Sequence, residues 1–248
     1  MAPDAADDGR MTLVEHLTEL RRRLFICLIA VAVCSVVVFA FYAQLLDFLS
    51  DPYREVTKDI ARCRPRGCDL TAIDPLAPFL TRIKVATWGG IALSLPVTMF
   101  QIWRFVTPGL HPHERRYAIP FIVSSVILFA LGATLSWFTL TKALDFLFTQ
   151  GGDIEPNIVI DKYLNLVTFM VLAFGAAFQF PVLLVFLLLV GAVSTSQLRR
   201  SRRHAAVLIV TTAAIITPSQ DPYSLFLMAL PMYVFYEVSI IIGRVLKR

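Results

Sequence analysis

Two glutamates, Glu19 and Glu114, each stand beside arginines at the edge of an apolar segment. Glu19 is followed by arginines at 21–23, and Glu114 by Arg115 and Arg116. Two carboxylates on one membrane surface can receive two guanidinium groups by bidentate pairing, which lysine satisfies poorly. Such a surface can therefore receive a pair of arginines. For each glutamate taken alone, the residues favour the alternative, in which it pairs with its own neighbouring arginines on a solvated face.

A second group of polar side chains lies within the apolar segments. Gln179 is two residues before Pro181, and Asp221 lies in the turn 218–222. Polar groups inside a membrane are costly and face the protein interior or a partner helix. We expect Gln179 and Asp221 to contact a partner's helix. The alternative for Gln179 is that it satisfies a carbonyl freed by Pro181.

The sequence argues against catalysis and cofactor binding. It has no nucleotide-binding glycine loop, HExxH zinc motif or GxSxG elbow. The four histidines lack a shared metal spacing, so no metal and no cofactor are expected. An intramembrane enzyme would need paired aspartates, a Ser/His pair or a metal site within the spans. A small secondary transporter would need inverted repeats and a midplane site, and it is kept as the alternative function.

These residues must be positioned by transmembrane helices. The chain has 248 residues, 57% of them hydrophobic, and about 20 apolar residues cross a bilayer as a helix. We expect an all-α polytopic membrane protein with six spans in one domain, 11–248, preceded by a disordered tail, 1–10. An amphipathic surface helix over 11–24 should lead into the first span. The six expected spans are 24–46, 78–103, 118–140, 162–190, 205–217 and 224–243.

The charge distribution orients this bundle. Most lysines and arginines fall in the segments 1–23, 104–117, 191–204 and 244–248. The positive-inside rule then places both termini in the cytoplasm. A cleavable signal peptide is the alternative for the first apolar run, but that run is too long for the apolar region of such a peptide.

Proline and helix length shape the bundle further. Pro96, Pro181 and Pro231 lie inside the second, fourth and sixth spans, where each removes a hydrogen bond and bends its helix. The fifth span, 205–217, reaches only about 20 Å at 1.5 Å per residue. The hydrocarbon core is about 30 Å thick. The turn with Asp221 should therefore lie at membrane depth, or the bilayer should thin around it.

The first outer loop carries two cysteines. Cys63 and Cys68 flank the segment 64–67, which contains a proline. This spacing can bring the two Cα atoms to disulfide distance, and the outside of the cell is oxidising. A zinc site is the rival interpretation, and it would need two further ligands that the loop does not offer.

Taken together, the motifs resemble the TatC family of the twin-arginine translocase. Each motif alone is weak, whereas their order across six spans is specific. The matching segments are 16–24, 94–96, 101–105, 108–110, 113–116, 174–181, 217–222 and 230–237.

The resemblance implies a cup-shaped, six-helix protein of the bacterial cytoplasmic membrane, embedded in membrane lipids and part of a multimeric complex. Such a protein binds twin-arginine signal peptides of folded proteins and works with the single-span subunits TatA and TatB, driven by the proton-motive force. Glu19 and Glu114 would receive the arginine pair, and Arg21, Phe105 and Leu110 would belong to the same patch. Pro52 would shape the first outer loop. Some relatives carry glutamate where this chain has Gln179.

Overall fold

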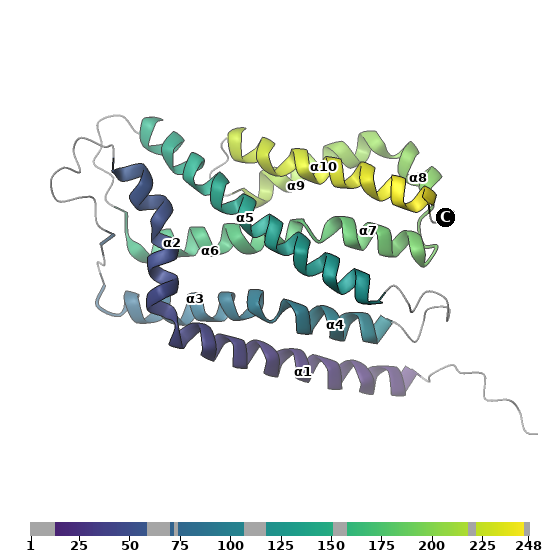
Figure 1. Ribbon diagram of the computed structural model, residues 1–248, viewed down its shortest axis with the longest axis horizontal. Coiled ribbons are helices and arrows are strands. Elements are labelled where there is room, and N and C mark those ends of the chain that lie inside the picture. The colour runs from purple at the N-terminus through teal and green to yellow at the C-terminus, as the bar shows by residue number, and fades with distance from the viewer. Residues whose placement is uncertain are drawn as a thin grey trace, which may run out of the picture.

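The described part of the chain is almost entirely helical (Figure 1). The computed structural model describes residues 13–58, 70–71, 74–106, 118–150, 158–217 and 222–245. An isolated parallel bridge joins Thr71 to Val159. The helices are α1 (Leu13–Ala40), α2 (Tyr42–Thr57), α3 (Ala77–Leu93), α4 (Leu95–Val106), α5 (Ala118–Gln150), α6 (Ile160–Ala177), α7 (Phe180–Leu189), α8 (Thr195–Arg200), α9 (Arg202–Ile216) and α10 (Pro222–Val245).

Several helices are long and apolar enough to cross a membrane. Four segments qualify alone: Val14–Ala40, Ile119–Thr149, Ile160–Leu189 and Pro222–Val245. A fifth forms if α3 and α4, which meet at a 50° bend, count as one span. Helix α9 has 15 residues, or about 22 Å at 1.5 Å per residue, less than the hydrocarbon thickness. The multi-span, all-α class expected from the sequence is confirmed. Helix α9 corresponds to the short fifth span expected over 205–217.

The helix ends sort to two ends of the molecule (Figure 1). The start of α1, the end of α4, helix α8 and the end of α10 lie at one end, which we call the Glu19 end. Helix α2, the end of α5 and the start of α6 lie at the other, which we call the α2 end. The described chain therefore starts and finishes at the same end, as an even number of passes requires.

The first helix differs from the expected first span. Helix α1 runs without interruption from Leu13 to Ala40 and includes the expected surface helix. At Phe41 the chain turns, and α2 runs across the direction of the other helices. Residues 42–46, which the sequence analysis places in the first span, belong to α2. The Phe48 ring of α2 stacks on Trp137 of α5, with ring centroids 4.2 Å apart, and this contact holds α2 in its direction.

Two of the four prolines singled out from the sequence lie in the first turn of a helix, and the other two lie inside helices. Pro96 is the second residue of α4, directly after the 50° bend, and Pro181 is the second residue of α7. Proline costs little in a first turn, where the N–H has no intrahelical partner. Pro231 lies inside α10. Pro52 lies inside α2 and is buried, and its role in shaping the first outer loop stays a prediction.

The core is centred on α6. Leu164, Val167 and Phe174 of this helix are completely buried, and α6 packs against α3 and α5. Close approach depends on glycine: a Cβ on Gly132 of α5 would lie 2.6 Å from the Phe174 carbonyl oxygen. Helix α1, by contrast, has no buried residue in its apolar window and packs on α3 and α4 at the edge of the bundle.

Candidate functional site

Glu19 lies near the start of α1 and is held by Arg23, one turn further along. Arg23 donates to Glu19 Oε1 from Nε at 3.1 Å and also from Nη2. The second carboxylate oxygen, Oε2, is buried and has no hydrogen-bond partner among the described residues. The local-pairing alternative thus applies to one oxygen of Glu19, and the other oxygen lacks a donor. The pairing cation is Arg23, while Arg21 is exposed on another side of the helix.

The end of α4 is brought to the start of α1. The Phe105 ring stacks on His16, with centroids 4.4 Å apart and planes at 23°. His16 precedes Glu19 by three residues, so the two lie on neighbouring positions of one helix face. The structure therefore brings Phe105 of α4 to the face of α1 that carries Glu19. Glu114 and Leu110 lie in segment 107–117, outside the described residues.

Behind Phe105, an aromatic cluster fixes α4 to the bundle. Trp103 is buried and stacks on Phe121 of α5 at 4.7 Å. It also meets Phe186 of α7 edge-on at 5.8 Å. Aromatic pairs of this geometry add about 0.5–1.5 kcal/mol beyond area burial. The sequence analysis did not assign Trp103 a role, although an aromatic residue two positions before Phe105 is a signal for such an anchor.

Gln179 connects α6 and α7 and is bonded within the protein. Its Nε2 donates to the Ser125 carbonyl of α5 at 3.0 Å and approaches the Gly175 carbonyl at 3.5 Å. Neither is the Ala177 carbonyl that Pro181 would free. The Gln179 Oε1 is buried without a hydrogen-bond partner among the described residues. The Gln179 amide thus has one acceptor that no described residue uses. Asp221 lies outside the described residues.

Gln179 lines a hollow of about 310 Å³ between α4, α5 and α7. Met99 and Ile102 of α4 form one of its walls, with Trp103 at the same wall. These residues precede Phe105 on α4, so the hollow starts within about 9 Å of it along the helix axis, at 1.5 Å per residue. Helix α4 thus carries both the Phe105 contact with His16 and the residues that line this hollow.

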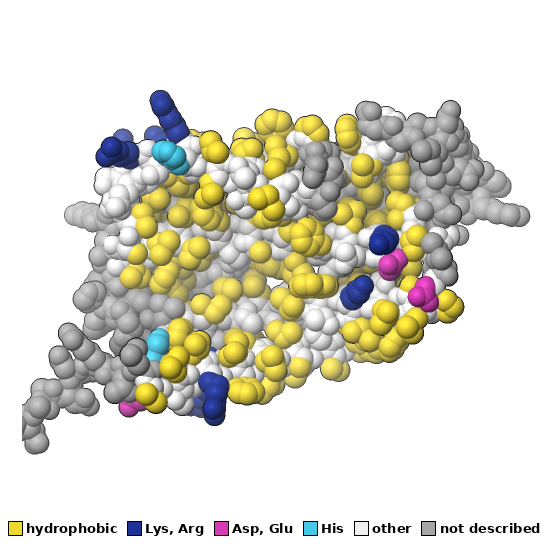
Figure 2. Space-filling view, turned by 180° about the vertical axis from the view of Figure 1, so that it is seen from behind, with side chains coloured by type: hydrophobic (Ala, Val, Ile, Leu, Met, Phe, Trp, Pro, Cys, Tyr) yellow, Lys and Arg dark blue, Asp and Glu magenta, His cyan; other side chains and the backbone are white. Residues whose placement is uncertain are grey.

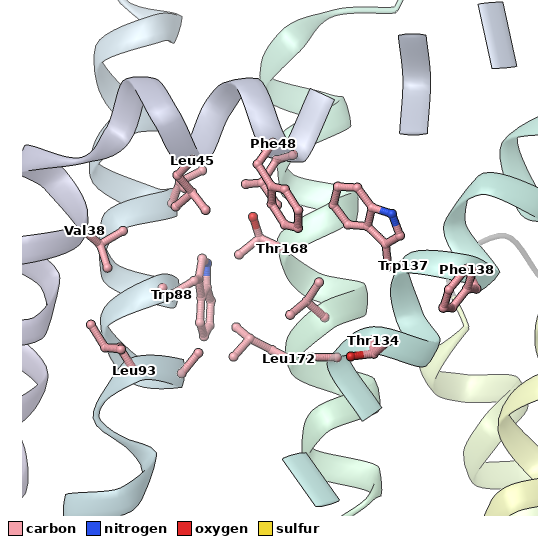
Figure 3. A pocket seen from close by; sticks show the side chains of 16 residues that line it. Val38, Leu45, Phe48, Trp88, Leu93, Thr134, Trp137, Phe138, Thr168 and Leu172 are labelled. Atoms are coloured by element: carbon pink, nitrogen blue, oxygen red, sulfur yellow. The ribbon is translucent and has the colours of Figure 1, made fainter. Parts of the chain in front are cut away.

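A larger hollow of about 590 Å³ opens between α1, α2, α3, α5 and α6 (Figure 3). Trp88 and Trp137 face it from opposite sides, and Phe48 of α2 closes it toward the α2 end. Its few polar groups include Thr168, whose buried hydroxyl has no partner among the described residues. The side chains that line this hollow are mainly apolar, which suits an apolar occupant.

Side-chain bonds hold helix α2 and the end of α1 beside this hollow. The Tyr163 hydroxyl donates to the Leu49 carbonyl at 2.7 Å. Arg82 donates to the Phe39 carbonyl at 3.0 Å, and its guanidinium lies 4.1 Å from the Phe39 ring centroid. The sequence analysis missed this role for Arg82. An arginine one turn inside an apolar span was the available signal.

No metal centre is found in the described ranges: no group of three His, Cys, Asp or Glu side chains is placed to hold an ion there. Cys27 and Cys34 are free thiols. Cys63 and Cys68 lie in 59–69, outside the described residues, so their disulfide stays a prediction.

The chain is similar to known translocase proteins over most of its length. The sequence model of the family described as Sec-independent protein translocase protein (TatC) matches residues 15–231. The TatC protein of Frankia casuarinae is 40% identical over 243 residues, which are 96% of this chain and 66% of that protein. The Escherichia coli protein is 35% identical over 94% of this chain and 88% of its own length.

The fold comparison agrees. A crystal structure of the twin arginine translocase receptor TatC matches with a TM-score of 0.75 at 35% identity, covering 94% of this chain and all of that one. A second crystal structure, in DDM, matches with a TM-score of 0.77 over 92% of this chain. The chain therefore belongs to the TatC family of Sec-independent protein translocase proteins, multi-pass proteins of the bacterial cytoplasmic membrane.

Proposed function

We propose that this protein is the receptor subunit that binds twin-arginine signal peptides of folded proteins and starts assembly of the export site. The observation that carries the proposal is the Glu19 carboxylate: one oxygen is held by Arg23, and the other has no donor in the part of the chain that the structure describes. A buried acceptor without a donor costs free energy, about 1–3 kcal/mol. An incoming guanidinium that reaches Oε2 would remove that cost.

The stacked pair of His16 and Phe105 favours the same ligand. Guanidinium groups stack on aromatic faces more readily than ammonium groups do. One arginine of the peptide would bond to Glu19, and the second would bond to Glu114 in the adjoining segment 107–117. Leu110 and Arg21 would border this patch. The apolar segment that follows the arginines in a signal peptide, about 7–15 residues, would enter the hollow lined by Met99 and Ile102.

The proposal also includes the orientation of the protein in the membrane and its partner subunits. The Glu19 end faces the cytoplasm, because arginines at positions 21–23, 199, 200, 202 and 203 lie there. TatA and TatB, single-span subunits, join the complex, and the proton-motive force drives transport. Gln179 would accept a hydrogen bond from a partner helix, and Asp221 would meet the same partner where α9 is too short to cross an undistorted bilayer.

The test compares a labelled Arg-Arg signal peptide with its Lys-Lys variant, using full-length protein in lipid nanodiscs. The Arg-Arg peptide should bind at least about tenfold more tightly, because a bidentate charge-assisted pair is lost with lysine. Glu55→Gln, which neutralises an exposed carboxylate on α2 at the other end, is the matched control for Glu19→Gln. Equal affinity for the two peptides would refute the proposal.

A further inference from the structure

The link between α8 and α9 forms a cationic platform at the Glu19 end. Five basic or titratable side chains fall within six residues: Arg199, Arg200, Arg202, Arg203 and His204. Only Arg202 has an ion pair among the described residues, with Glu237 of α10 at 2.7 Å. The other four are exposed. In Figure 2, dark blue and cyan side chains lie together at the upper left, at this end of the molecule.

The platform is rigid. Ser194 and Gln197 form a reciprocal capping box at the start of α8. The Leu198 side chain is buried, and its carbonyl accepts a hydrogen bond from the Tyr236 hydroxyl of α10 at 2.6 Å. Together with the Arg202–Glu237 pair, these bonds tie both sides of the turn to α10. The exposed arginines therefore project from a fixed base, which lowers the entropy lost when they bind a ligand.

Among the described residues, the charge of this platform is largely uncompensated. Between residues 194 and 217 the sequence contains no aspartate or glutamate. In the facing part of α10, 235–245, the only carboxylate is Glu237, which Arg202 already occupies. Arg244, in the last turn of α10, is exposed and adds a further positive charge. The positive-inside rule accounts for basic residues at this end. It does not require that they project from a fixed base, or that most of them lack an ion pair among the described residues.

Directly beneath the arginines lies an exposed apolar surface. Val207 and Leu208 of α9 are 68% and 60% exposed. They lie one turn below Arg203 and His204, on the same helix faces. Cations at the surface level and apolar side chains one turn deeper match the two parts of a phospholipid, its phosphate and its acyl chains.

We propose that the α8–α9 platform binds the phosphate headgroup of an anionic phospholipid in the leaflet at the Glu19 end. Arg199, Arg200 and Arg203 would hold the phosphate, and the acyl chains would lie along Val207 and Leu208. Anionic surfaces attract each nearby arginine by about 1 kcal/mol, which is about a fivefold preference per side chain. This lipid site is separate from the peptide site at Glu19 and does not depend on the proposed peptide binding.

The test is native mass spectrometry of the full chain, released from micelles that hold equal amounts of phosphatidylglycerol and phosphatidylcholine with identical acyl chains. The natural sequence should retain phosphatidylglycerol in excess. The variant R199Q/R200Q/R203Q should lose roughly tenfold or more of that excess. R199K/R200K/R203K, which keeps the charges, should retain most of it. K84Q/K142Q/K162Q, which removes three exposed charges elsewhere, should change it little.

Each remaining outcome overturns the proposal. An unchanged excess in the glutamine variant would place the lipid elsewhere, and an equal loss in the lysine-to-glutamine control would indicate total charge rather than a site. Displacement of the lipid by inorganic phosphate, but not by chloride at equal ionic strength, would indicate a free-anion site. If the natural sequence retains the two lipids equally, the platform would instead be a site for an acidic protein segment.

Discussion

Replacing Glu19 by glutamine separates the charge of this side chain from its shape. In the structure, Arg23 donates to Oε1, and Oε2 has no donor among the described residues. In the proposed complex, the peptide would bond to Oε2. A hydrogen bond to a charged group contributes about 1.5–3 kcal/mol, and a neutral one about 0.5–1.5 kcal/mol. Glu19→Gln should therefore weaken binding of the Arg-Arg peptide by about 1–1.5 kcal/mol, or roughly five- to tenfold.

The companion change, Arg23→Gln, tests how the pair works. Because Arg23 donates to Oε1 of Glu19, it competes with the peptide for the carboxylate. Its removal frees both oxygens for a bidentate guanidinium, so peptide affinity should stay equal or rise. Fluorescence anisotropy with the labelled peptide, on protein in nanodiscs, measures both variants. If Arg23→Gln weakens binding as much as Glu19→Gln does, the ion pair is a structural unit and the reasoning is wrong.

Three further predictions concern other parts of the molecule. Gln179→Leu should reduce transport into membrane vesicles but leave peptide binding intact, because the proposed bond from a partner helix to Gln179 Oε1 would be lost; equal loss of both would indicate a folding role through Ser125. Gly132→Ala should lower the unfolding temperature in detergent by the equivalent of about 1–3 kcal/mol, because its Cβ would lie 2.6 Å from a backbone oxygen; an unchanged unfolding temperature would count against this packing. Mass mapping of non-reduced protein from its native membrane should show a Cys63–Cys68 disulfide, and two free thiols would exclude it.

Much of the fold could be predicted because apolar runs and prolines act locally. The six runs each correspond to a helix or a broken helix pair, and Pro96 and Pro181 stand at the starts of α4 and α7. The turn at Phe41 could not be predicted, because the sequence stays largely apolar and uncharged through Leu46. Tertiary contacts hold it, namely Arg82 on the Phe39 carbonyl and the stack of Phe48 on Trp137.

The candidate site was predictable in its residue types but not in its contacts. The Glu19 carboxylate was found from charge alone, but the sequence offers three adjacent arginines, and only helix geometry selects Arg23 at the i+4 position. The contact of Phe105 with His16 joins two helices separated by α2 and α3. Such pairings depend on how α1 and α4 pack, which sequence periodicity does not determine.

Photo-crosslinking from position 105 tests the central claim most directly. A photoreactive phenylalanine analogue in place of Phe105 lies beside His16, at the Glu19 end. We predict strong crosslinking to the Arg-Arg signal peptide and weak crosslinking to its Lys-Lys variant. The same analogue at Phe226, an exposed position in α10, should crosslink to neither. Equal yields with both peptides, or crosslinking at 226 but not at 105, would contradict a twin-arginine receptor site at Glu19.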